Sequence, residues 1–200
     1  VEEVTVGDVN PCAVKIAQDN MKLNGLDNVT VEKNDANIML QSNKGLFDVV
    51  DIDPFGTPSM FLQSTAANIR PGGLICISAT DTSALCGTYH DPCFRKYGAQ
   101  PQKTEYCHEN GIRILIASIA RNLAVNQKYM EVLFSHSTEH YMRVYGIVKR
   151  GSKKTNESLD NIGFIAHCPN CLHREYSYGY APHLPECCPF VSVSYFSSLS

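Results

Sequence analysis

The sequence lacks the features that would place the chain in a membrane or outside the cell. It has no apolar run of about eighteen residues, the length that a membrane-spanning helix requires. Residues 1–8 are strand-like and mixed with acids, which argues against a secretion signal. An overall positive charge is also absent, because 17 Lys and Arg stand against 20 Asp and Glu. We therefore expect a cytoplasmic protein whose partners are not revealed by net charge alone.

The pattern of the nine cysteines is not that of a small disulfide-rich domain. Five of them are scattered through segments that resemble helices and strands, whereas four cluster near the end of the chain. Cys168 and Cys171 have the spacing of metal ligands. This distribution favours a reducing compartment and one metal site. The scattered cysteines are Cys12, Cys76, Cys86, Cys93 and Cys107, and the clustered ones are Cys168, Cys171, Cys187 and Cys188.

A glycine-rich turn between a first strand and a first helix is missing as well. A dinucleotide-type fold expects such a turn before Asp8, and Gly72-Gly73 is no substitute because it precedes a predicted strand. The chain begins without Met, directly inside a predicted strand. We therefore expect a fragment whose first strand has been cut away.

The first eighty residues alternate predicted strands and helices. Strands are predicted to end at Asp8, near Asp35 and at Asp53, and the apolar run over 47–52 is typical of a buried parallel strand. This rhythm predicts an α/β fold with a parallel sheet and helices on both faces. The predicted strands are 3–6, 28–32, 47–52 and 74–78, and the predicted helices are 11–23, capped by Asn10, and 59–69.

The acids at three strand ends give the first functional indication. In parallel α/β sheets, ligands bind beyond the carboxyl ends of the strands. An acid at such an end commonly binds ribose hydroxyls, which is the role we expect for Asp8, and Asp35 with Ala36 is expected to hold an adenine amino group. Together with Asp53 these residues predict a cofactor cleft.

The second half of the chain is predicted to complete the catalytic domain and to add a small appendage. Residues 79–104 are irregular, and a helix over 105–124 is followed by an antiparallel pair of strands, 131–135 and 141–148. We expect a partial catalytic domain over 1–150, a polar linker over 151–161 and the start of a cysteine-rich domain over 162–200.

The segment 53–56 (DPFG) can polarise an amine on a nucleobase. Such an amine is a poor nucleophile because its lone pair is delocalised into the ring. The Asp53 carboxylate and the Pro54 carbonyl can accept both amine hydrogens, and Phe55 can stack on a base flipped out of its helix. The same turn also suits an Asp that only caps the next helix.

Five short segments resemble the tRNA guanine-26 N2-dimethyltransferase family, in the order in which that family has them. They are 51–58 (DIDPFGTP), 80–87 (TDTSALCG), 95–99 (RKYGA), 107–109 (CHE) and 140–144 (HYMRV). The resemblance implies a Rossmann-like methyltransferase domain that uses S-adenosyl-L-methionine to add one or two methyl groups to guanine N2 in tRNA. It assigns ribose binding to Asp8, adenine contacts to Asp35 and Ala36, and catalysis to Asp53, with Pro54 and Phe55 beside the base.

The resemblance also implies a structural zinc site formed by Cys168, Cys171 and Cys188. Val191 stands where the fourth cysteine is expected, with Cys187, His173 and His183 as substitutes, and we interpret the end of the chain as irregular. No metal is expected in the methyl transfer itself.

The middle of the chain carries its positive charge, since residues 81–154 hold 11 Lys and Arg against 6 Asp and Glu. Arg95, Lys96 and Arg143 are the predicted phosphate contacts, with Lys149 and Arg150 as further candidates. His108-Glu109 is interpreted as a helix start, and Cys86 and Cys107 as buried, unreactive thiols.

Two other functions remain compatible with the residues. One is a methyltransferase that acts on adenine or cytosine amines in DNA or in another RNA, because an acid-Pro-aromatic turn serves that chemistry as well. The other is a zinc-containing RNA-binding module without activity.

Overall fold

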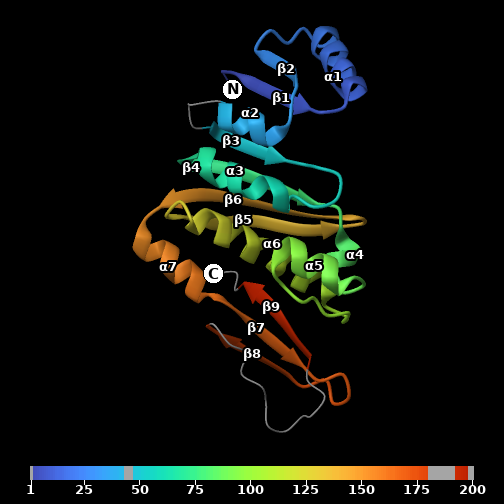
Figure 1. The fold of residues 1–200 in the computed structure, drawn as a ribbon, viewed down its shortest axis with the longest axis vertical. Coiled ribbons are helices and arrows are strands. Elements are labelled where there is room, and N and C mark those ends of the chain that lie inside the picture. Colours follow the sequence, from blue (N-terminus) through green and yellow to red (C-terminus); the bar gives the residue numbers. More distant parts are fainter. Residues whose placement is uncertain (1, 43–46, 180–191, 198–200) are drawn as a thin grey trace. The chain divides into compact units, whose positions relative to one another are not determined.

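A computed structural model describes residues 2–42, 47–179 and 192–197 of the chain (Figure 1). The chain forms two compact units, Val1–Leu46 and Phe47–Ser200. No helix among the described residues is both long enough and apolar enough to cross a membrane.

The first unit contains two parallel strands and two helices. Strand β1 (Val4–Asp8) pairs with β2 (Val29–Lys33), with Asp8 opposite Lys33 at the carboxyl edge. Helix α1 (Pro11–Leu23) begins as predicted, because the Asn10 side chain accepts the N–H of Cys12 and Pro11 occupies the first turn. Helix α2 (Ala36–Ser42) follows β2 directly and was not predicted.

The second unit contains a four-stranded sheet with the order β3-β4-β6-β5. Strands β3 (Phe47–Ile52) and β4 (Ile69–Ala79) are parallel, and β6 (Tyr141–Arg150) is antiparallel to both β4 and β5 (Lys128–Thr138). The antiparallel pair that was predicted from the sequence is therefore confirmed. The 3-10 turn η1 (Ser59–Phe61) and α3 (Leu62–Asn68) connect β3 to β4.

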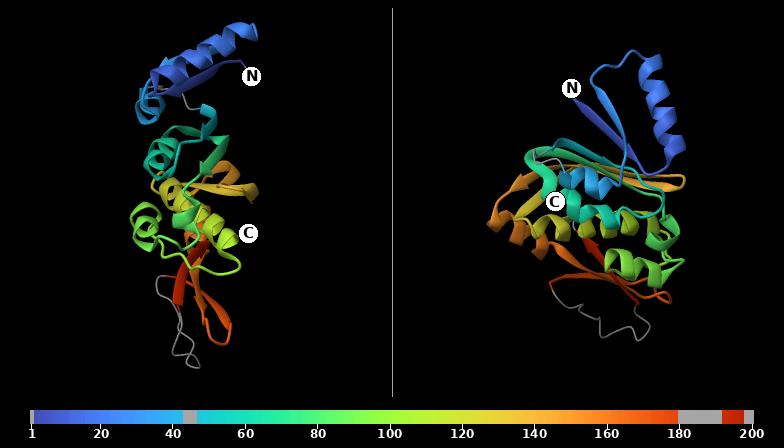
Figure 2. Two further views of the ribbon diagram at one scale, coloured as in Figure 1. Left: turned by 90° about the vertical axis from the view of Figure 1, so that its right-hand side faces the viewer. Right: turned by 45° about the horizontal axis from the view of Figure 1, so that its top comes forward.

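Helix α6 (Cys107–Ala124) forms the centre of this unit. Its apolar positions are almost completely buried, including Ile114, Leu115, Ile119 and Leu123. One side of α6 packs on β5 and β6, and Ala117 and Ala120 pack on Ile162 of the following sheet. The helix therefore lies between two sheets, as Figures 1 and 2 show.

The predicted irregular segment 79–104 contains two helices. They are α4 (Thr82–Leu85) and α5 (His90–Tyr97). The predicted linker contains α7 (Ser152–Asp160), which begins after Gly151 and contacts α6. A polar sequence indicated a loop there, but polar residues also suit the exposed side of a helix that packs on a partner.

An antiparallel sheet with the order β8-β7-β9 follows α7. Its strands are β7 (Ile162–His167), β8 (Arg174–Tyr178) and β9 (Ser192–Ser197).

Residues 71–73, which precede the predicted strand 74–78, lie inside β4. The register with β3 jumps from Phe47 opposite Ile69 to Val49 opposite Leu74, so the intervening residues bulge out of the ladder. A side chain at Gly73 would lie 2.9 Å from the carbonyl oxygen of Asp48. Glycine is therefore required there by close approach of the neighbouring strand.

A buried lysine closes the end of α3. The Lys128 ammonium donates to the carbonyl oxygens of Ala66 at 2.7 Å, Ala67 at 3.1 Å and Ile69 at 2.7 Å. Burial, followed by the charge of Arg150, lowers the pKa of Lys128. These three bonds satisfy carbonyl groups that a helix end leaves without partners.

Candidate active site

The segment 53–56 forms the turn that leaves the carboxyl end of β3. The Asp53 side chain is 67% exposed, and the Phe55 ring is fully exposed. Gly56 has a φ of 82°, a left-handed conformation that a side chain would strain. An exposed acid and an exposed aromatic ring therefore stand next to each other on a tightly turned backbone.

The end of β4 holds this turn through backbone contacts. The Gly56 N–H donates to Thr80 Oγ1 at 2.6 Å, and the Thr80 N–H donates to the Gly56 carbonyl at 2.9 Å. These bonds join residues 24 positions apart in the sequence. The carboxyl ends of β3 and β4 thus fix the position of Phe55 from one side.

A buried tyrosine on α5 holds the turn from a second side. The Tyr97 hydroxyl donates to Asp81 Oδ1 at 2.6 Å and accepts from Thr57 Oγ1 at 2.9 Å. Lys96 donates to the second oxygen of Asp81 at 2.9 Å. Burial, with the neighbouring Asp81 charge, raises the pKa of Tyr97 well above its usual range. The hydroxyl therefore stays protonated and remains a donor to Asp81.

Arg143 on β6 holds the acids of β3 from a third side. Its guanidinium donates to Asp51 Oδ2 at 2.6 Å, Ser78 Oγ at 2.5 Å and the Tyr145 hydroxyl at 2.8 Å. It lies 3.8 Å from Asp53 Oδ2. Burial opposes the charge on Arg143, but Asp51 outweighs it and raises the pKa of the guanidinium.

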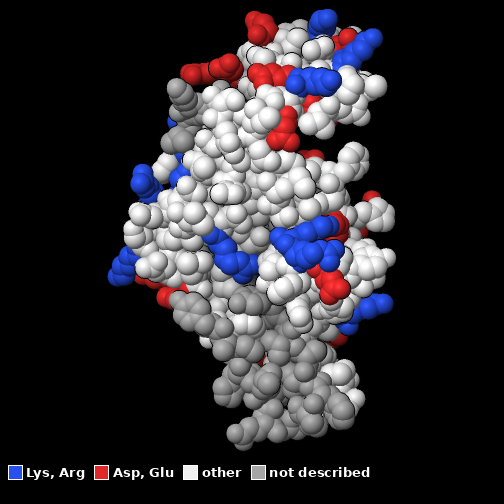
Figure 3. Space-filling model, in the orientation of Figure 1, with Lys and Arg blue, Asp and Glu red and all other residues white. Residues whose placement is uncertain are grey.

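These contacts change the interpretation of two predicted phosphate ligands. The Arg143 side chain is only 15% exposed, and its donors point to protein groups. Lys96 is paired with Asp81, whereas Arg95 is exposed. Figure 3 shows Lys and Arg side chains gathered over α5 with acidic side chains beside them. The surface charge at α5 is therefore mixed, and both Lys96 and Arg143 have structural partners.

Asp8 and Asp35 lie at the same edge of the sheet in the first unit. Asp8 ends β1, and its Oδ1 accepts the N–H of Asn10 at 2.7 Å. Asp35 follows β2, and its Oδ1 accepts the N–H groups of Asn37 at 2.8 Å and Ile38 at 3.4 Å. Asp35 therefore caps α2, whose first residue is Ala36. Each carboxylate has a second oxygen besides the one that these bonds occupy.

Two of the three predicted zinc ligands lie in the described residues. Cys168 is buried and Cys171 is exposed, and they flank a tight turn in which the Leu172 N–H donates to the Cys168 carbonyl at 2.9 Å. The Cys168 N–H donates to the His173 carbonyl at 3.0 Å. Cys188, Cys187 and His183 lie outside the described residues. The zinc site thus stays a prediction.

The residues that sequence reasoning missed are Thr80, Asp81 and Tyr97. All three lie in the segments 80–87 and 95–99, so their motifs were recognised but their roles were not. Only the fold brings these segments to the turn after β3, since no local pattern relates Asp81 to a tyrosine 16 residues away.

A family model described as N2,N2-dimethylguanosine tRNA methyltransferase matches residues 1–195. A protein of Methanosphaera stadtmanae, named tRNA (guanine(26)-N(2))-dimethyltransferase, is 82% identical over 189 residues, which are 94% of this chain and 48% of that protein. A protein of Methanobrevibacter smithii with the same name is 51% identical over 94% of this chain and 49% of its own length. The chain thus spans about half the length of the curated relatives it matches.

A solved structure of Trm1 from Pyrococcus horikoshii with S-adenosyl-L-methionine has the same fold. Its TM-score is 0.87 at 29% sequence identity, over 96% of this chain and 54% of that one. Trm5b from Pyrococcus abyssi gives a TM-score of 0.52 at 18% identity, over 74% of this chain and 38% of that one, which indicates a shared fold alone. The predicted α/β methyltransferase fold is confirmed by the Trm1 structure.

Proposed function

The chain belongs to the N2,N2-dimethylguanosine tRNA methyltransferase family, and on that basis we propose that it forms part of an enzyme that methylates N2 of guanine 26 in tRNA. The donor is S-adenosyl-L-methionine, and one or two methyl groups are added. The observation that carries the proposal is the convergence of three elements on the turn after β3. Thr80, Tyr97 and Arg143 hold the turn or its acids, while Asp53 and Phe55 stay exposed.

Asp53 and Pro54 polarise the guanine amine in this proposal. The Asp53 carboxylate and the Pro54 carbonyl accept its two hydrogens, which frees the nitrogen lone pair from the ring. Phe55 stacks on the flipped base, and base–aromatic stacking contributes about 1–3 kcal/mol. Asp53 then accepts the proton that the nitrogen releases on methylation. The nearby Arg143 guanidinium, at 3.8 Å, attracts the Asp53 carboxylate and helps to orient it.

Asp8, Asp35 and Ala36 hold the donor in this proposal. The Asp8 carboxylate is exposed, and one of its oxygens is occupied by the Asn10 N–H. The other oxygen can accept a ribose hydroxyl. One oxygen of Asp35 caps α2, so the other suits the adenine amino group beside Ala36. When bound, S-adenosyl-L-methionine supplies a methyl group that its sulfonium already activates.

tRNA binding is proposed to involve Arg95 most directly. Its side chain is exposed on α5, close in sequence to the residues that hold the turn. Lys96 and Arg143, predicted from the sequence as phosphate contacts, are proposed to act mainly by positioning Asp81 and the acids of β3. A structural zinc bound by Cys168, Cys171 and Cys188 remains part of the proposal for the whole protein.

Methyl transfer from labelled donor to an unmodified tRNA transcript tests the proposal. Because the relatives are about twice as long, the assay uses this chain placed in the matching segment of the Methanosphaera stadtmanae protein. Parallel reactions replace guanine 26 by adenine in the RNA, and Asp53 by Ala in the protein. Asp48→Ala is the matched control, since Asp48 is an exposed acid of β3 that pairs with Arg70.

Label that depends on guanine 26 and on Asp53, but not on Asp48, is the expected result. Donor binding without transfer to tRNA would refute the proposal and favour an amine in DNA or in another RNA. Absence of label, together with tRNA binding that persists in Asp53→Ala and is lost in Cys168→Ser, would instead favour the zinc-containing RNA-binding module.

A further inference from the structure

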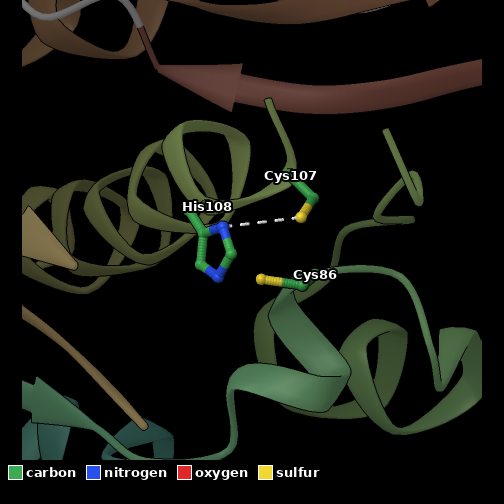
Figure 4. A group of neighbouring side chains, drawn as sticks. All are labelled: Cys86, Cys107 and His108. Atoms are coloured by element: carbon green, nitrogen blue, oxygen red, sulfur yellow. Dashed lines mark hydrogen bonds between the residues drawn. The ribbon is translucent and has the colours of Figure 1, made fainter. Parts of the chain in front are cut away.

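Two cysteines and a histidine from separate segments meet at the start of α6. Cys86 follows α4, whereas Cys107 and His108 begin α6 (Figure 4). Their ligand atoms, two sulfurs and one ring nitrogen, all lie within 4.8 Å of one another. The sequence predicted buried, unreactive thiols here, but the three side chains point toward one another. Cys86 and Cys107 are partly exposed, and His108 is exposed.

The spacing of these atoms fits a tetrahedral metal site. Zinc bonds of about 2.3 Å to sulfur and 2.0–2.1 Å to nitrogen place tetrahedral ligands roughly 3.6–3.8 Å apart. Cys107 Sγ already lies 3.7 Å from His108 Nδ1. The distances among the three ligand atoms, at up to 4.8 Å, exceed the tetrahedral spacing by about an ångström at most.

The local charge also suits a divalent cation. Two thiolates neutralise a 2+ ion, so the bound site carries no net charge. A site without net charge avoids repulsion from the positive end of the α6 dipole. Soft sulfur ligands with an imidazole select zinc over magnesium or calcium, which prefer oxygen.

We propose that Cys86, Cys107 and His108 bind one zinc ion, with water as the fourth ligand. The site is separate from the zinc site predicted at Cys168 and Cys171. It ties the end of α4 to the start of α6. Since Asp81 immediately precedes α4, the metal also restrains the segment that positions Tyr97.

Cobalt titration of the full chain carrying Cys168→Ser and Cys171→Ser tests the site. This background removes the two described ligands of the other predicted site. Cobalt(II) reports tetrahedral geometry through the intensity of its d–d bands and reports thiolate ligands through charge-transfer bands. We expect one cobalt equivalent per chain with both signatures, which zinc displaces.

The test variant adds Cys107→Ser and His108→Ala and is expected to lose this equivalent. The matched control adds Cys12→Ser and His140→Ala, which remove an exposed cysteine and an exposed histidine elsewhere, and keeps it. Retention of the cobalt spectrum by the test variant would overturn the proposal.

Alkylation of the unmodified chain gives a readout that does not depend on folding of a variant. Zinc is expected to protect Cys86 and Cys107 together from iodoacetamide, as mapped by mass spectrometry, and to leave Cys12 reactive. Protection confined to Cys168 and Cys171 would contradict the proposal. So would a Cys86–Cys107 disulfide in protein purified with reductant, because zinc binding requires both thiolates.

Discussion

Removal of a single oxygen, in Tyr97→Phe, should weaken the fold and the turn after β3 together. The ring is 2% exposed, and phenylalanine keeps its packing. The substitution deletes the 2.6 Å hydrogen bond to the Asp81 carboxylate and the acceptor for Thr57. A hydrogen bond to a charged group contributes about 1.5–3 kcal/mol, and a neutral one about 1 kcal/mol. We therefore expect a loss of about 2.5–4 kcal/mol in the free energy of unfolding.

The pH dependence of this loss follows from the raised pKa of Tyr97. In the unfolded chain the hydroxyl ionises near its ordinary pKa of about 10, whereas in the folded chain it keeps its proton. The folded state therefore binds more protons above that pH, so the stabilisation present at lower pH declines as the pH rises past about 10. Tyr97→Phe should remove this part of the alkaline decline.

Urea unfolding followed by circular dichroism at pH 8 and at about pH 10.5 measures both effects. Tyr89→Phe is the control, because Tyr89 is exposed at the start of α5. Its midpoint should match that of the unmodified chain. The reasoning is refuted if Tyr97→Phe lies within about 0.5 kcal/mol of the unmodified chain at pH 8, or if the two lose stability equally on going to the higher pH.

Three further substitutions separate stability from activity. Lys128→Met leaves the carbonyls of Ala66, Ala67 and Ile69 without this donor, and because the bonds to Ala66 and Ile69 are buried the substitution should cost about 3 kcal/mol in urea unfolding. Lys149→Met, at an exposed pair, should leave the midpoint unchanged. Phe55→Ala should lower kcat/KM for tRNA by about 10–100-fold through lost stacking, without changing the melting temperature. Arg143→Lys should lower kcat about tenfold or more with little change in KM for tRNA, because a lysine cannot reproduce the planar set of bonds to Asp51, Ser78 and Tyr145. A raised KM with a shallower salt dependence would show instead that Arg143 contacts phosphate.

The first half of the chain could be predicted because its signals are local. Asn10 and Pro11 specify the start of α1, and the apolar run over 47–52 specifies a buried strand. The short helices α2, α4 and α5 were missed because fewer than two or three turns give too little apolar periodicity to detect. The polar helix α7 was missed because its stability comes from tertiary packing on α6.

The exposed residues of the candidate site could be predicted from the sequence, whereas the residues that hold them in place could not. Asp53 and Phe55 follow a recognisable strand, and their chemistry is readable from residue type. Arg143 meets Asp51 across 92 residues, so composition could suggest only a phosphate contact for it. The proximity of Cys86 to Cys107 could not be predicted for the same reason, because contacts between residues far apart in the sequence depend on the topology of the fold.

The position of α6 between two sheets affects how this unit can unfold. Ala117 and Ala120 pack on Ile162 of β7, while other positions of the same helix pack on β5 and β6. Opening of either sheet would expose one side of a helix whose other side is still covered. Amide hydrogens of β6 and β7 should therefore exchange with solvent in the same cooperative event. Strand β7 thus belongs to the same hydrophobic core as β5 and β6, and a truncation before β7 would leave one side of α6 exposed to water.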